Sequence, residues 1–226
     1  MASYFNLTLD TTSVSNPTIS LENGNIYATN QLITAIIGCG DGNTTGYSIK
    51  IWGSIDTTFD INVQDTETNS SWITYTTSKQ IKLSSGDGLK TVYLKVRDDV
   101  WNESSQVSDS INLDLTLPTV TVSGSDVPKI SKITGKNTAS FSFQCSEIFD
   151  EYMVKVVASS GAAHDTGTTI PSTGGSTNIS GSAENYPANT PINVQIKGID
   201  FETASAGDGI KVVKVFCKDK SGVWSA

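Results

Sequence analysis

Apolar and polar residues alternate along most of this chain. In the segment "TVYLKV", Val92, Leu94 and Val96 fall on one face of an extended strand, and the residues between them fall on the other. A strand with one apolar and one polar face is typical of an antiparallel sheet that is buried on one side only. The pattern therefore predicts antiparallel sheets.

Such segments recur every 8 to 15 residues in the first half of the chain. They predict strands at about 17–22, 31–37, 47–52, 59–63, 72–76, 80–84, 89–97 and 106–116. Seven or eight short strands in about 110 residues are typical of a β-sandwich. The composition agrees, because the chain is rich in Thr, Ser, Val and Ile and only 17% of its residues are charged.

The chain contains an internal repeat. "GDGLKTVYLKVRDDVW" begins at Gly86, and "GDGIKVVKVFCKDKSGVW" begins 121 residues later at Gly207. Order and polarity agree between the two copies, so the 226 residues predict two similar domains rather than one. We place them at residues 1–117 and 118–226.

A second pair of segments extends the alignment upstream. "GYSIKIWGS" resembles "EYMVKVVAS", which matches Tyr47 with Tyr152 and Lys50 with Lys155. Between this pair and the Gly-Asp-Gly pair, the second copy carries about 16 extra residues. They fall in a polar stretch at about 158–191, where we expect an exposed loop or a polar hairpin.

The four tryptophans, Trp52, Trp72, Trp101 and Trp224, are candidates for a sugar-stacking platform. The alignment of the repeat matches Trp101 with Trp224. A shared position favours a packing role for these two side chains over a role in binding.

Two stretches resemble a known family. "DGLKTVYLKVRDDVWNESS" resembles the penultimate strand and turn of the immunoglobulin-like modules found in bacterial surface proteins and in virion proteins of tailed phages. "LDLTLPTVTVSG" (113–124) is similar to their inter-domain junction and first strand. The resemblance covers nearly the whole chain, twice, and implies two tandem immunoglobulin-like antiparallel β-sandwich domains. It implies no active site, because such modules serve as display and adhesion units.

The second copy lacks a counterpart of the last strand of the first. After Trp101 the first copy continues with "NESSQVSDSINLDLT", in which Val107, Ile111, Leu113 and Leu115 are apolar, whereas only two residues follow Trp224. The template therefore predicts that the final strand of the second domain is absent. An open strand edge is a ready site for pairing with another chain.

The N-terminal segment "FNLTLD" (5–10) resembles "INLDLT" (111–116), the end of that last strand. We hypothesise that residues 4–10 of a neighbouring copy fill the open edge by strand addition. The predicted contact residues are Phe5, Leu7 and Leu9 on one copy and Val213, Val215 and Cys217 on the other. The sequence leaves open an alternative in which the extra residues of the second copy close the edge within the same chain and residues 4–10 simply begin the first domain.

Charge and composition exclude several partners. A net charge of −8 with a pI near 4.5 argues against nucleic-acid binding, which relies on Lys and Arg to neutralise phosphates. No window approaches the roughly 20 apolar residues of a membrane-spanning helix, and "MASYFNLTLD" lacks the basic region and apolar core of a signal peptide. We therefore expect synthesis in the host cytoplasm without membrane insertion.

Candidate chemistry is sparse. The single histidine, His164, precedes Asp165-Thr166-Gly167, but no apolar strand leads into this tripeptide as it would in an aspartic protease. We expect no enzymatic activity, no catalytic residues and no cofactor. Asp41 and Asn43, in the loop "GCGDGNTTG", are weak candidates for a Ca²⁺ site because the bidentate Glu of a full calcium loop is missing. The three cysteines have neither zinc nor redox spacing and are expected to be buried thiols.

These observations favour a structural component of a tailed-phage virion, either a capsid decoration or a tail-associated protein. It would act by assembly with other virion structural proteins, as a homo-oligomer or array. The alternative is a bacterial surface adhesin or carbohydrate-binding immunoglobulin-like module, of which this chain would be a fragment cut at Ala226.

Overall fold

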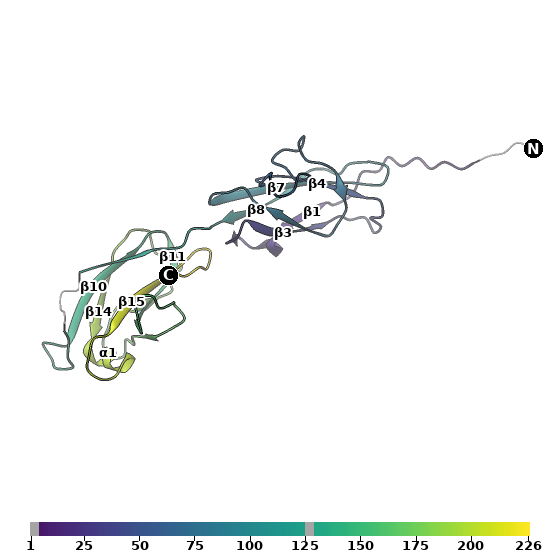
Figure 1. Ribbon diagram of the computed structural model, residues 1–226. Coiled ribbons are helices and arrows are strands. Elements are labelled where there is room, and N and C mark those ends of the chain that lie inside the picture. Colours follow the sequence, from purple (N-terminus) through teal and green to yellow (C-terminus); the bar gives the residue numbers. More distant parts are fainter. Residues whose placement is uncertain (1–4, 125–128) are drawn as a thin grey trace, which may run out of the picture. The chain divides into compact units, whose positions relative to one another are not determined.

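The computed structural model describes residues 5–124 and 129–226. The chain divides between Leu115 and Thr116 into two compact units, here called the first and second domains. Each is an immunoglobulin-like antiparallel β-sandwich, so the predicted fold class is confirmed (Figure 1). Residue 4 of the predicted N-terminal segment and residues 125–128 of the predicted second domain lie outside the described part of the chain.

The first domain pairs a three-stranded sheet with a five-stranded one. The smaller sheet has the order β1 (Thr18–Leu21), β3 (Leu32–Gly38), β6 (Ser78–Lys82), and a short 3-10 helix, Glu22–Gly24, follows β1. The larger sheet has the order β2 (Tyr27–Ala28), β8 (Val107–Leu113), β7 (Gly88–Arg97), β4 (Ser48–Gly53), β5 (Ile73–Thr74). Among the described strands of this domain, β2 and β8 form the one parallel pair. Inward-facing residues of both sheets form one core, as alternation requires.

The second domain repeats this plan. One sheet has the order β14 (Ile192–Lys197), β10 (Thr138–Cys145), β9 (Val120–Ser123). In the other, β11 (Phe149–Val157) pairs along one edge with β15 (Val212–Asp219) and along the other with β12 (Thr168–Thr169) and β13 (Ser180–Gly181). The single α-helix of the described residues, α1 (Gly198–Ala204), connects β14 to β15.

The strand orders show which elements correspond. The trio β9-β10-β14 matches β1-β3-β6, and β15 beside β11 matches β7 beside β4. No described strand of the second domain matches β8, which pairs with the outer edge of β7 in the first domain.

The register corrects the predicted match of Tyr47 with Tyr152. Val96 pairs with Ile49, and its counterpart Cys217 pairs with Tyr152. Tyr152 therefore takes the place of Ile49, and by the same two-residue shift Lys155 takes the place of Trp52 rather than of Lys50. A shift of two leaves every side chain on its original face, so the apolar pattern alone cannot detect it.

The predicted match of Trp101 with Trp224 is also wrong. Arg97 bridges to Glu103 in the first domain, and Lys218 bridges to Trp224 in the second, so Trp224 corresponds to Glu103. Trp101 corresponds instead to Gly222, and both have a left-handed backbone, with φ of 73° and 88°. The argument for a shared packing role of the two tryptophans therefore fails.

Two predicted segments differ from expectation. Residues 59–63 form turns rather than a strand, because the Asp60 side chain accepts a hydrogen bond from the Asn62 backbone at 2.9 Å and so stabilises a tight turn. The polar stretch 158–191 is not simply exposed: its Ile170 and Ile179 are buried in the core and bond to the backbone of Val154.

Candidate functional site: an open strand edge in the second domain

The outer edge of β15 is the clearest departure of the second domain from the first. Among the described residues, β15 has one strand partner, β11. The inserted strands β12 and β13 pair with the opposite edge of β11, because the backbone of Val154 bonds to Ile170 and Ile179 there. The alternative in which the insertion seals the edge of β15 is therefore wrong.

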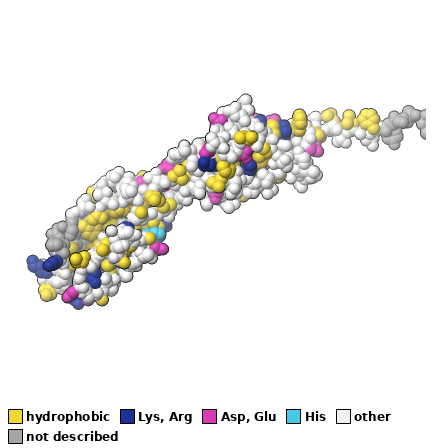
Figure 2. Space-filling view, in the orientation of Figure 1, with side chains coloured by type: hydrophobic (Ala, Val, Ile, Leu, Met, Phe, Trp, Pro, Cys, Tyr) yellow, Lys and Arg dark blue, Asp and Glu magenta, His cyan; other side chains and the backbone are white. Residues whose placement is uncertain are grey.

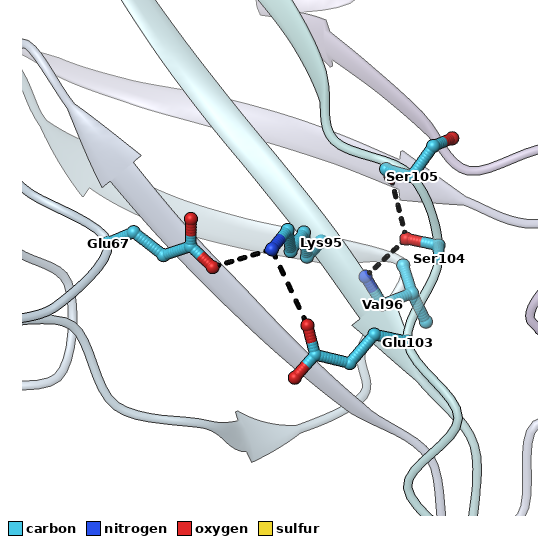
Figure 3. Close-up of polar contacts among 6 residues, drawn as sticks. All are labelled: Glu67, Lys95, Val96, Glu103, Ser104 and Ser105. Atoms are coloured by element: carbon cyan, nitrogen blue, oxygen red, sulfur yellow. Dashed lines mark hydrogen bonds and ion pairs between the residues drawn. The ribbon is translucent and has the colours of Figure 1, made fainter.

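The turn that follows β7 in the first domain has the same hydrogen bonds as the turn that follows β15 in the second. In the first domain, the backbone N–H of Val96 donates to Ser104 Oγ at 3.0 Å, and the Ser104 N–H donates back to the Val96 carbonyl at 2.8 Å (Figure 3 shows the first of these bonds). In the second domain, Cys217 and Ser225 make the same two bonds at 3.2 and 2.8 Å. The last strand of the first domain thus starts from a turn that the second domain reproduces.

Beside the open edge lies an apolar groove of about 650 Å³. It lies between β15 and the sheet of β9, β10 and β14, and Figure 2 shows hydrophobic side chains gathered over β10 and β15 on this face. Its apolar lining consists of Val122, Ile130, Ala139, Phe141, Ile196, Phe201, Ile210, Val213 and Val215. Two basic side chains, Lys129 and Lys211, complete it together with Gly209.

One of the β15 side chains that line the groove is more exposed than its counterpart in the first domain. Val213 is only partly buried, whereas its counterpart Val92 is fully buried beneath β8. Val122 on β9 is 54% exposed, and Ile210 is 100% exposed, although the counterpart of Ile210, Leu89, is itself 65% exposed. In the first domain, Ile111 and Leu113 of β8 are buried and shield this side of the core from solvent.

The basic residue at the start of the strand shows the same contrast. Lys90 in the first domain is buried, and its ammonium group donates to Ser84 Oγ and to the Ser85 carbonyl. Lys211, its counterpart, donates to the Ala206 carbonyl at 3.0 Å at an exposed position. The second domain therefore presents a positive charge at one end of the groove.

The predicted contact residues of the N-terminal segment form an exposed arm. Phe5, Leu7 and Leu9 are 84%, 86% and 86% exposed, and residues 5–10 belong to no strand. The hydrophobic side chains of this arm are visible in Figure 2. The last residue of the arm contacts the first domain, because the Asn102 side chain donates to the Asp10 carbonyl at 3.4 Å. From Val14 onward the chain packs there, because Val14 is buried in the core and the Ser15 carbonyl accepts the Gly40 N–H at 2.8 Å.

Of the three contact residues predicted on β15, Val213 and Val215 line the groove and Cys217 does not. Cys217 is fully buried in the core, as is Cys145. A hydrogen bond with Cys145, together with burial, raises the pKa of the Cys217 thiol. The third cysteine, Cys39, is half-buried, and all three are free thiols.

The calcium candidates have protein partners. Asp41 accepts hydrogen bonds from the Ser15 hydroxyl at 2.7 Å and from the Tyr47 hydroxyl at 3.0 Å, one on each carboxylate oxygen. The bond from Ser15 contributes most to lowering the pKa of Asp41, and burial together with the bond to Asp41 raises the pKa of Tyr47 to about 12. Asn43 accepts the N–H of Thr45 and so stabilises its own turn.

His164 also has a structural setting. Its ring stacks on Trp224 with the ring centroids 5.1 Å apart, and its carbonyl accepts a hydrogen bond from Lys155 Nζ at 2.6 Å.

The sequence prediction missed an aromatic and cationic cluster on the first domain. The Arg97 guanidinium lies 4.5 Å from the ring centre of Trp72 and 4.9 Å from that of Trp101, and Lys50 Nζ lies 5.0 Å from Trp72. Trp101 is 72% exposed. Lys50, Trp72 and Arg97 are far apart in the sequence, and the pairing of β4 with β5 and with β7 brings them together.

No helix among the described residues is long and apolar enough to cross a membrane. No protein-family model matches the chain, and no curated protein matches it either.

Solved structures share only distant likeness. The fibronectin(III)-like modules of CbhA from Clostridium thermocellum are 10% identical over 92% of this chain and 90% of theirs, with a TM-score of 0.42. The D00-D0 domain of intimin is 12% identical over 92% of this chain and 97% of its own, with a TM-score of 0.29. Chitinase ChiA74 from Bacillus thuringiensis is 15% identical over 89% of this chain and 28% of its own, with a TM-score of 0.28. The fold assignment accordingly rests on the strand order of the chain itself.

Proposed function

We propose that this chain is a non-enzymatic assembly module, a structural component of a tailed-phage virion that binds other particle proteins through the open edge of β15. The observation that supports it most directly is the apolar groove beside an unpaired strand edge. Exposed strand edges and exposed apolar patches are both typical of protein–protein contact sites. The virion setting depends on the resemblance of the two sequence stretches to immunoglobulin-like virion modules.

The groove is suited to a protein segment rather than to a small polar ligand. Its lining is mostly aliphatic and aromatic, and the adjacent strand edge offers backbone donors and acceptors in a row. An extended peptide satisfies both features at once, because its backbone pairs with the edge while alternate side chains enter the groove.

A pair of neighbouring substitutions on β15 tests the proposal. Val213 faces the groove, whereas Val212 precedes it on the opposite face of the strand, and both are partly buried. We expect Val213→Lys to abolish association of the protein with purified particles or with itself, measured by sedimentation velocity, and Val212→Lys to leave it unchanged. Equal association of the two variants would reject the groove as the contact site.

A second candidate function is glycan binding by the Trp72–Arg97–Trp101 cluster. It is favoured by the exposure of Trp101 and by its left-handed backbone, since strained backbone concentrates at functional sites. Titration of the protein against a glycan array tests it. Binding that Trp101→Ala removes would support this function, and silence across the array would count against it.

A further inference from the structure

We propose that the groove beside β15 receives the N-terminal arm, residues 5–10, of a second copy of this chain as an added strand. Copies would then join head to tail. The inference rests on the proposed function and names the partner and the segment that fill the site.

The segment that fills the groove must pair with β15 and insert apolar side chains, as β8 does next to β7 in the first domain. β8 pairs antiparallel with β7 and inserts Ile111 and Leu113 into the core opposite Lys90 and Gly88. The second domain keeps the equivalent strand, β15, and the equivalent turn at Ser225. Only the strand and its two buried side chains are missing from the described residues.

The arm carries the matching pattern. Phe5, Leu7 and Leu9 alternate with Asn6 and Thr8, so an extended arm has one apolar and one polar face. Its sequence resembles residues 111–116, the part of the chain that fills this place in the first domain. The three apolar side chains are almost fully exposed, which is unfavourable unless something covers them.

The register of the first domain fixes which side of the arm faces the groove. Val107, Asp109 and Ile111 of β8 pair with Leu94, Val92 and Lys90, whose counterparts are Val215, Val213 and Lys211. Because β15 begins at Val212, an arm that pairs with it places Phe5 opposite Val215, Leu7 opposite Val213 and Leu9 opposite Lys211. A shift of one residue turns the apolar side chains to solvent, so it is excluded.

Charge also agrees. The two charged residues that line the groove, Lys129 and Lys211, are both basic, and the arm ends in Asp10. Attraction between unlike charges favours this end of the arm beside the basic side chains.

The arm and the groove belong to different surfaces of the chain, so the contact is heterologous. Each copy that offers its arm to a neighbour still has an open groove of its own. Such contacts generate rings or open filaments rather than closed two-fold dimers.

Charge substitutions on the two faces of the arm test the proposal. In Leu7→Lys/Leu9→Lys the buried side chains become cationic, whereas Asn6→Lys/Thr8→Lys adds the same charge to the solvent face. We expect the first variant to associate at least about 100-fold more weakly than the wild type, because burial of each leucine contributes about tenfold or more to affinity. We expect the second to associate like the wild type in sedimentation velocity over a range of concentrations.

Mixing two defective variants gives the sharpest result. Leu7→Lys/Leu9→Lys retains the groove, and Val213→Lys retains the arm. Each should sediment alone as a single chain of 24.0 kDa. Their mixture should form a complex of one copy of each and stop there, because only one intact arm and one intact groove are present.

The outcomes separate this inference from the proposed function. If Val213→Lys abolishes association but Leu7→Lys/Leu9→Lys does not, the groove binds a different segment, and the inference fails while the proposed function stands. If neither variant weakens association, both fail. A wild-type chain that remains single at every concentration, or a mixture of the two variants that forms no complex, overturns the inference as well.

Discussion

The two domains share strand order, register and the turn after the penultimate strand, yet they finish differently. In the first domain β8 covers the core, and Val92, Leu94 and Val96 beneath it are fully buried. In the second domain no described strand takes that place, and the same side of the core forms a groove. The comparison shows that the remaining strands of this sandwich keep their arrangement without the last one. The absent strand changes the surface rather than the fold.

The second domain adds packing elsewhere. Its insertion contributes Ile170 and Ile179 to the core, and α1 places Phe201 against it. Ile170 and Ile179 bond to the edge of β11 that faces away from β15, and Phe201 also lines the groove. None of these additions pairs with the outer edge of β15, so the groove persists.

The largest expected effect is the difference in unfolding free energy between truncating a buried side chain of β8 and truncating an exposed side chain beside the groove. Leu113→Ala removes a buried side chain of β8 and should lower the unfolding free energy of the first domain by about 2–5 kcal/mol. Ile210→Ala, at a fully exposed position beside the groove, should change the stability of the second domain by less than about 0.5 kcal/mol. Urea unfolding of the full chain, followed by tryptophan fluorescence, measures both. A cost of more than about 1 kcal/mol for Ile210→Ala would mean that this side chain is covered in solution.

A second prediction concerns a stabilising contact that only the second domain has. Asp200 in α1 is buried and accepts hydrogen bonds from the backbone N–H groups of Gly174 and Ser176 at 2.6 and 2.9 Å. Burial opposes its charge, but these bonds and those from Ser176 and Thr173 side chains outweigh it and lower the pKa of Asp200. Asp200→Asn should therefore destabilise the second domain by about 1–3 kcal/mol near neutral pH.

The pH dependence of the destabilisation by Asp200→Asn provides a control for this prediction. Because the folded-state pKa of Asp200 lies below its unfolded value, its ionised form stabilises the fold above about pH 4, and this contribution is lost as the pH falls through the folded-state pKa. The gap in unfolding free energy between wild type and Asp200→Asn should narrow below about pH 4. A gap that stays constant down to pH 3 would contradict the assigned role of the carboxylate.

The repeated strands were predictable because each carries its own period-two pattern. The sequence also predicted that β15 has no partner equivalent to β8, and among the described residues no strand pairs with its outer edge. The two-residue shift that sets Tyr152 opposite Cys217 was not predictable, because side chains two residues apart share a face. At residues 59–63 the apolar alternation was overridden by the local hydrogen bond of Asp60, which favours a turn.

The candidate site was predictable only in part. Val213, Val215 and the arm followed from alignment of the repeat, but Val122, Phe141 and Phe201 come from β9, β10 and α1, and only folding brings them to the groove. The Trp72–Arg97–Trp101 cluster was missed for the same reason. The left-handed backbone of Trp101 gave no signal, because nothing in the residue type indicates it.

The smallest expected effect tests the correspondence of Trp101 with Gly222 directly. A left-handed backbone costs an L-residue about 1–2 kcal/mol and a glycine almost nothing. Trp101→Gly should therefore be more stable than Trp101→Ala by about 1 kcal/mol, since both variants lose the ring contact with Arg97 and only the glycine relieves the backbone. The converse change, Gly222→Ala, should destabilise the second domain by a similar amount, because its added Cβ meets no atom within 4 Å and the cost is conformational. If urea unfolding finds the two variants at position 101 equally stable, the backbone there is not held left-handed. The turns after β7 and β15 would then differ. The match between these turns would no longer support the inference that an added strand pairs with β15.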